Sequence, residues 1–163
     1  EYVERLYIPA AEASRRIDET TYSVARDLAA WKKKVRAGWP GVRIEHVEAD
    51  GVGDAVLLGT PITVRAFVAL GDLSPEDVVV QAVYGRVDAD DRIAQPSTTK
   101  MEAVEQYDGN RWQYRLVVTL DKNGPFGYTV RALPTHAALA SPNEMGLQSL
   151  PLISPGLADG VLR

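Results

Sequence analysis

The segment RWQYRLVVTL, residues 111–120, alternates between apolar and polar side chains. Successive side chains of a β-strand point to opposite faces, so this alternation is typical of a strand with one face in a core and one in solvent. The apolar set consists of Trp112, Tyr114, Leu116, Val118 and Leu120. The segment therefore predicts a half-buried strand.

The same period of two recurs along most of the chain after Gly41. It is clear in residues 61–70 and 126–133 and weaker in residues 77–87, and further candidate strands lie at residues 42–47, 55–58 and 101–107. Turn-forming residues separate these segments, as at Asp108-Gly109-Asn110. No helical pattern interrupts them, so the connections are short and the sheet must be mainly antiparallel. About seven strands fit a mainly β fold, an antiparallel immunoglobulin-like β-sandwich.

An N-terminal helical segment precedes this sandwich. Val24, Leu28, Trp31 and Val35 are spaced by four, three and four residues, which places them on one stripe of a helix. We expect two helices, because Pro9 disfavours helical geometry in the residue before it. The second helix is expected to end at Gly38-Trp39-Pro40-Gly41, with a glycine in the left-handed conformation.

These patterns predict three parts. Residues 1–40 form a helical lead-in, residues 41–134 form the β-sandwich, and residues 135–163, which contain three prolines, form a C-terminal extension over the surface. The first residue is not methionine and already reads as part of a helix. We therefore expect the sequence to be a piece of a longer protein.

The composition narrows the classes of function. The chain has 163 residues, of which 45% are hydrophobic and 25% charged, and this balance predicts a folded domain. Its net charge of −4 argues against non-specific binding to nucleic acid, which needs a basic surface. The absence of cysteine excludes disulfides and thiolate catalysis and favours a cytoplasmic protein. No apolar run approaches the roughly 20 residues of a membrane-spanning helix, so no membrane partner is predicted.

The residues that commonly carry chemistry form no catalytic or metal-binding pattern. His46 and His136 are the only histidines and lack zinc-ligand spacing. The acidic run Asp88, Asp90 and Asp91 lacks the glycine and glutamate of a calcium loop and is interpreted as a hairpin turn. We therefore predict no catalytic, cofactor-binding or metal-binding residue.

Aromatic residues are the one candidate for binding. Trp112 and Tyr114, with Tyr84, are candidate contacts for a glucan, because sugar rings stack on aromatic faces; their place on an alternating apolar face favours core packing. A carbohydrate-binding module would need Trp112, Tyr114 or Trp39 on an exposed platform. A protein-interaction domain is the other alternative.

Three segments carry a resemblance to a known family. The segment GPFGYTVRALPTHAALASPNEMGL, residues 124–147, resembles the C-terminal signature of bacterial α-glucan (glycogen, maltodextrin or starch) phosphorylases. EYVERLYIPAA, residues 1–11, looks like the helix that closes the phosphorylase body. LGDLSPEDVVV, residues 70–80, with Val83-Tyr84-Gly85, looks like a strand pair of the appended sandwich.

The resemblance implies a parent enzyme that splits terminal α-1,4-glucosyl units with phosphate and releases glucose 1-phosphate. Such enzymes hold pyridoxal phosphate on a lysine near a Gly-Thr-Gly-Asn motif, and none of the five lysines here has that neighbourhood. The chain is therefore expected to be inactive alone. Its expected partners are the catalytic body of the parent and α-glucan, and its expected role is to brace that body, mediate assembly or hold glucan.

Overall fold

The computed structural model describes residues 2–51, 59–90, 92–119 and 125–152, with side chains described from residue 18 onward. The chain divides into two compact units, Glu1–Val35 and Arg36–Arg163. The three-part division expected from the sequence, at residues 40 and 134, stays a prediction.

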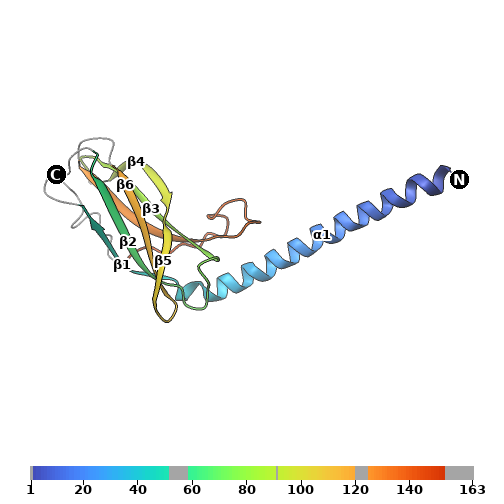
Figure 1. Ribbon diagram of the computed structural model, residues 1–163, viewed down its shortest axis with the longest axis horizontal. Helices are drawn as coiled ribbons and strands as arrows, with labels where there is room; N and C mark the ends of the chain where they lie inside the picture. The colour runs from blue at the N-terminus through green and yellow to red at the C-terminus, as the bar shows by residue number, and fades with distance from the viewer. Residues whose placement is uncertain (1, 52–58, 91, 120–124, 153–163) are drawn as a thin grey trace. The chain divides into compact units, whose positions relative to one another are not determined.

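The N-terminal helix α1 is continuous from Tyr2 to Gly38 (Figure 1). The prediction of two helices separated at Pro9 is therefore wrong. A proline inside a helix removes one backbone hydrogen bond and strains one turn. The residues that follow, AAEASRR, are mostly strong helix formers, and the helix continues through that turn.

The end of α1 was predicted at the right place but with the wrong geometry. A short 3₁₀ turn, η1, covers Trp39–Gly41, and the backbone N–H of Val42 donates to the carbonyl of Trp39 at 2.9 Å. Gly38 has a φ of −83°, and Gly41 is not among the described glycines with positive φ, so neither forms the left-handed cap expected. Its small size matters because a Cβ atom there would lie 2.8 Å from Cδ2 of Leu73.

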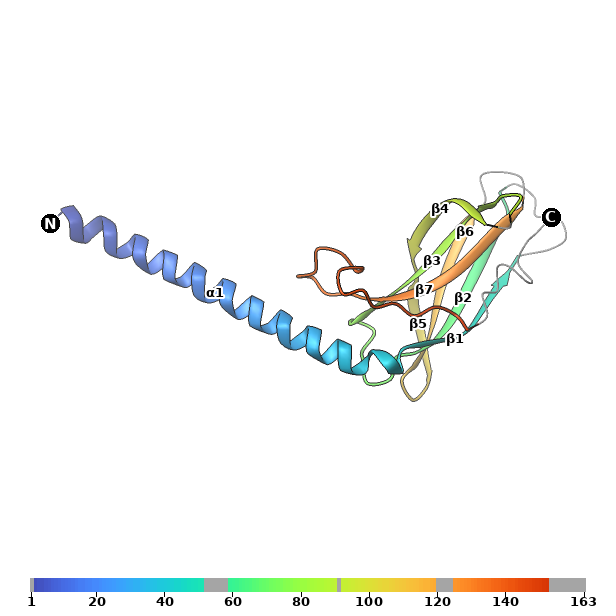
Figure 2. The ribbon, with the colours of Figure 1, turned by 180° about the vertical axis from the view of Figure 1, so that it is seen from behind.

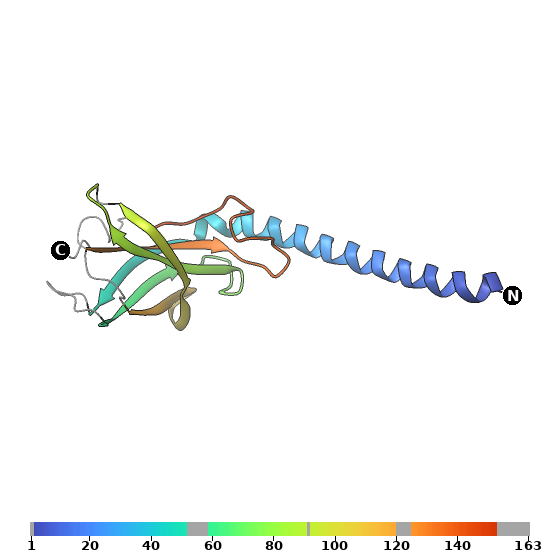
Figure 3. The ribbon, with the colours of Figure 1, turned by 90° about the horizontal axis from the view of Figure 1, so that it is seen from above.

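The second unit is a sandwich of two antiparallel sheets, as predicted. The strands are β1 (Arg43–Asp50), β2 (Pro61–Ala69), β3 (Val78–Val87), β4 (Ile93–Lys100), β5 (Glu102–Asp108), β6 (Arg111–Thr119) and β7 (Phe126–Pro134). One sheet has the order β1-β2-β6-β5 and the other β4-β3-β7. Figure 2 labels the strands from behind, and Figure 3, from above, shows the β3–β4 hairpin on one side and β1 and β2 on the other.

The strand order is that of an immunoglobulin-like sandwich with one change. In the four-stranded sheet, β1, β2, β6 and β5 correspond to strands A, B, E and D of the immunoglobulin fold. This correspondence counts β4 as an extra strand that follows β3, the equivalent of strand C. The second sheet then corresponds to strands C′, C and F. In the described part of the chain no further strand pairs with β7.

The core lies between the two sheets and follows the predicted alternation. From β2, Ile62, Val64, Ala66 and Val68 are at most 1% exposed, whereas Thr63, Arg65 and Phe67 on the other face are half-buried. The facing sheet contributes four residues with no exposure: Val80, Ala82, Val130 and Ala132. Burial of these side chains is the main force that holds the sheets together.

The residues after β7 return to that strand. The backbone groups of Ala132 and Ser149 exchange two hydrogen bonds of 2.9 Å, which form an isolated antiparallel bridge. Thr135 also donates its backbone N–H to the carbonyl of Asp77 at 2.9 Å. The described helix is not apolar enough along its length to cross a membrane.

Gly71, directly after β2, is a sensitive position. Its φ is +59°, and a Cβ atom there would lie 2.9 Å from Cα of Gly41. We expect Gly71→Ala to lower the free energy of unfolding by roughly 2 kcal/mol or more, because it adds backbone crowding to the left-handed strain. Gly109 is the matched control, since its φ is +54° but nothing lies within 4 Å of the added atom.

The control Gly109→Ala should cost only about 1 kcal/mol, the strain of the left-handed backbone. Urea denaturation followed by tryptophan fluorescence measures both values. Equal losses in the two variants would contradict the assignment of a close approach at Gly71.

Candidate binding cleft

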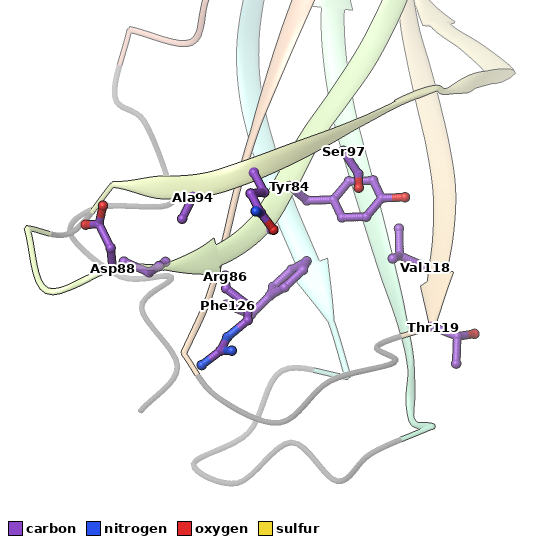
Figure 4. Close-up of a pocket in the computed structure, with 11 residues that line it drawn as sticks. Tyr84, Arg86, Asp88, Ala94, Ser97, Val118, Thr119 and Phe126 are labelled. Carbon is purple, nitrogen blue, oxygen red and sulfur yellow. The ribbon is translucent and has the colours of Figure 1, made fainter.

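A cleft of about 390 Å³ opens between the two sheets near the C-terminal ends of β3 and β6 (Figure 4). Tyr84 and Arg86 come from β3, Ser97 from β4, and Phe126 from the start of β7. The opposite sheet contributes Val118 and Thr119 of β6. Both sheets therefore build the cleft.

An aromatic pair forms the apolar wall of the cleft. The ring centroids of Tyr84 and Phe126 are 6.0 Å apart with an interplanar angle of 42°. The hydroxyl group of Tyr84 lies 3.0 Å from Oγ1 of Thr99, which fixes the ring direction. Tyr84 is half-buried, while Phe126 is only 6% exposed. The accessible aromatic surface is thus mainly that of Tyr84.

An irregularity in the β3–β4 pair shapes the rim. The register shifts between Tyr84 and Arg86. Gln95 on β4 has a backbone φ of +51°, which residues other than glycine rarely adopt. Gly85 permits the close approach of β4, because a Cβ atom there would lie 3.2 Å from the carbonyl oxygen of Ala94. Bulges of this kind re-aim side chains and are common beside binding sites.

Four polar side chains that have no partner among the described residues gather on the same rim. Arg86, Gln95, Ser97 and Thr119 line the cleft, and none of their side chains forms a hydrogen bond or ion pair with the described residues. Together these four side chains offer both hydrogen-bond donors and hydrogen-bond acceptors. They are free to bind a polar ligand.

Asp88, also on the rim, has a structural role. Its Oδ1 accepts hydrogen bonds from the backbone N–H groups of Asp90 at 2.9 Å and Arg92 at 3.0 Å. This geometry agrees with the predicted hairpin turn; Asp91 of the same acidic run lies outside the described residues. Within the described ranges, no group of three or more acidic or histidine side chains could hold a metal ion.

Of the aromatic residues predicted to contact glucan, Tyr84 lines the cleft, whereas Trp112 and Tyr114 do not. Tyr114 is 3% exposed, and burial raises the pKa of its hydroxyl to about 12. Trp112 is half-buried and donates its Nε1–H to Asn110 at 3.1 Å. Trp39 is 7% exposed. Tyr114 and Trp39 therefore present no ring face to solvent, and a glucan contact at Trp112 stays a prediction.

The two histidines also lie away from the cleft lining. His46 stacks against Phe67 with ring centroids 5.8 Å apart and lies 3.5 Å from a carboxylate oxygen of Glu48. His136 accepts a hydrogen bond at Nδ1 from the backbone N–H of Ala138 at 3.1 Å. Each histidine thus has a local structural neighbour.

The outer face of the four-stranded sheet carries ion pairs. Arg65 binds the carboxylates of Glu48 and Asp50, and these hydrogen bonds raise the pKa of its guanidinium. Arg111 binds Glu45 at 3.0 Å and Asp108 at 2.6 Å. The pairs of Arg65 join β2 to the neighbouring β1, whereas Arg111 of β6 pairs with Asp108 of β5 and reaches past β2 to Glu45 of β1. Such solvent-accessible pairs contribute modestly to stability.

The fold defines a β-sandwich module that carries a small cleft and is preceded by a long helix. The family model described as the glycogen phosphorylase C-terminal domain matches residues 39–152. The chain is 41% identical over 150 residues to a glycogen phosphorylase of Mycobacterium tuberculosis and 30% identical over 151 residues to a maltodextrin phosphorylase of Thermococcus litoralis. These matches cover 92% and 90% of this chain and 17% of each relative.

The chain belongs to the family of glycogen phosphorylase C-terminal domains. The resemblance to the C-terminal region of bacterial α-glucan phosphorylases, inferred from the three sequence segments, is confirmed.

Proposed function

We propose that this chain is the non-catalytic C-terminal part of an α-glucan phosphorylase, whose parent enzyme releases glucose 1-phosphate from α-1,4-glucan and inorganic phosphate. The observation that carries the proposal is the match over 92% of this chain to 17% of a glycogen phosphorylase. We expect the parent in the cytoplasm, in keeping with a chain that has no cysteine.

We place the pyridoxal phosphate site of such a parent outside this chain, because none of its five lysines has the sequence neighbourhood of the cofactor lysine. Lys32, Lys33 and Lys34 lie on α1, and Lys100 is an exposed residue at the end of β4. None of these four lines the cleft, and Lys122 lies outside the described residues. In this proposal the cofactor and the acid–base groups belong to the rest of the parent.

The role proposed for α1 is to dock on the catalytic body. Val24 is 50% exposed, and Leu28 and Trp31 are half-buried, so their stripe presents apolar surface to solvent in this chain. Covering that stripe would release about 25 cal/mol for each Å² removed from water. This chain matches 17% of its relatives' length, and we place the catalytic body in the remainder. The structural role that we propose for α1 is to brace that body.

The test uses the full-length parent with Val24→Lys and Leu28→Lys together. Two charges on the apolar stripe should lower the parent's melting temperature and its rate of phosphorolysis. The control is Ala29→Lys with Ala30→Lys, because both alanines are exposed and lie on the opposite side of α1. This control should change neither quantity.

Two results would count against the proposal. Glucose 1-phosphate released by the 163-residue chain alone would show that it is catalytic. Equal effects of the stripe variant and its control would remove the docking role of α1.

A further inference from the structure

The cleft combines one apolar wall with a polar rim, which is the chemistry of a sugar site. Its volume of about 390 Å³ lies in the range of small-molecule pockets. The C–H face of a sugar ring carries partial positive charge and packs on the electron-rich face of an aromatic ring such as Tyr84. The hydroxyl edge needs donors and acceptors, and Ser97 and Thr119 supply both.

The charges on the rim favour a neutral ligand. Arg86 and Asp88 both line the cleft, and their formal charges cancel. An anion such as phosphate would be attracted by Arg86 and repelled by Asp88. A neutral polyol can accept hydrogen bonds from the guanidinium and donate one to the carboxylate, so it uses both groups.

The strained backbone conformation at Gln95 is consistent with a ligand-binding site. A non-glycine residue with a φ of +51° persists only where its surroundings impose it, and such strain is often found at ligand sites. Here the β3–β4 bulge imposes it and keeps the Gln95 side chain on the rim. The strained residue lies where the polar side chains that have no partner among the described residues meet.

We propose that this cleft binds a short stretch of α-1,4-glucan, with Tyr84 against a sugar face and Arg86, Gln95, Ser97 and Thr119 binding hydroxyl groups. The identity of the sugar rests on the proposed function, because the parent acts on this polymer. The site would hold the polymer on the C-terminal module, which adds a second point of attachment to the catalytic body and raises the local concentration of chain ends.

The experiment is an NMR and calorimetric titration of the 163-residue chain with maltoheptaose. Saturable shifts are expected at the amides of Tyr84, Ser97 and Thr119. Arg86→Ala should weaken the affinity roughly fivefold or more, the loss of one charged hydrogen bond. Arg86 is exposed and unpaired among the described residues, so this change should leave the melting temperature unaltered.

A second variant distinguishes a loss of binding from a loss of folding. Gln95→Gly removes the rim side chain and relaxes the left-handed backbone, so it should weaken binding while raising the melting temperature. Arg115→Ala is the control, because Arg115 is an exposed arginine of β6 that does not line the cleft. Tyr114→Phe separates this site from the contact predicted at Tyr114, and both controls should bind as the unaltered chain does.

Three results would overturn the proposal: no saturable binding of maltoheptaose, equal loss in the Arg86 and Arg115 variants, or tighter binding of inorganic phosphate than of the sugar. Failure here leaves the proposed function intact if the stripe variant still impairs the full-length parent. Phosphorolysis by the chain alone would instead refute the proposed function, whatever the titration shows.

Discussion

Replacing Leu133 with alanine is expected to lower the free energy of unfolding of the sandwich by about 2–5 kcal/mol. Leu133 is 1% exposed in β7 and pairs across the ladder with Val79. The truncation removes three carbon atoms from a closely packed interior and leaves a cavity that the rigid strands only partly fill. Urea denaturation monitored by circular dichroism measures the loss.

Leu150→Ala makes the same chemical change at an exposed position. Leu150 is 49% exposed, so its truncation should cost about 0.5 kcal/mol or less. A loss at Leu133 no greater than that at Leu150 would mean that β7 does not pack in the core as described.

Alkaline pH should destabilise the sandwich through Tyr114. Burial raises the pKa of its hydroxyl from the ordinary value of 10.0 to about 12, and its oxygen has no hydrogen-bond partner among the described residues. Below pH 10 the residue is neutral in both states and its ionisation costs nothing. Above pH 10 only the unfolded chain ionises freely, so stability falls by about 3 kcal/mol by the time the pH exceeds 12.

Tyr114→Phe should remove this part of the pH dependence. At neutral pH the change should be nearly neutral or slightly stabilising, because it deletes a buried hydroxyl that has no partner among the described residues. Urea denaturation at about pH 8 and about pH 11 gives the slope for each protein. Tyr22→Phe alters a ring that is 67% exposed and should leave the slope unchanged; an identical slope in all three proteins would contradict the role of Tyr114.

The strands that the sequence predicts well are those whose two faces differ in polarity. β2, β6 and β7 lie within one residue of their predicted bounds, because each alternates between core and solvent. β4 was missed: its sequence IAQPSTTK has almost no apolar residue, and most of its side chains are exposed. Its strand conformation comes from pairing with β3, which no local pattern reveals. The predicted strand at residues 55–58 lies outside the described residues.

For a related reason, local sequence patterns could not predict the cleft. The sequence analysis named Tyr84, but grouped it with Trp112 and Tyr114. An alternating pattern shows which residues of one strand lie on the same face, but it does not show which strands meet at one end of a sandwich. Phe126 and Arg86 become neighbours only through the antiparallel register of β3 and β7. Ser97 and Gln95 belong to the missed strand. The polar segment with Pro96 was the one signal available.

The same polar strand has a consequence for how copies of the module meet. β4 is the last strand of its sheet, and such a strand is a ready template for backbone pairing with another chain. Pro96 has no N–H to donate, the bulge twists the ladder, and hydroxyl side chains keep the surface hydrated. These features discourage edge-to-edge pairing of β4 between copies of the module.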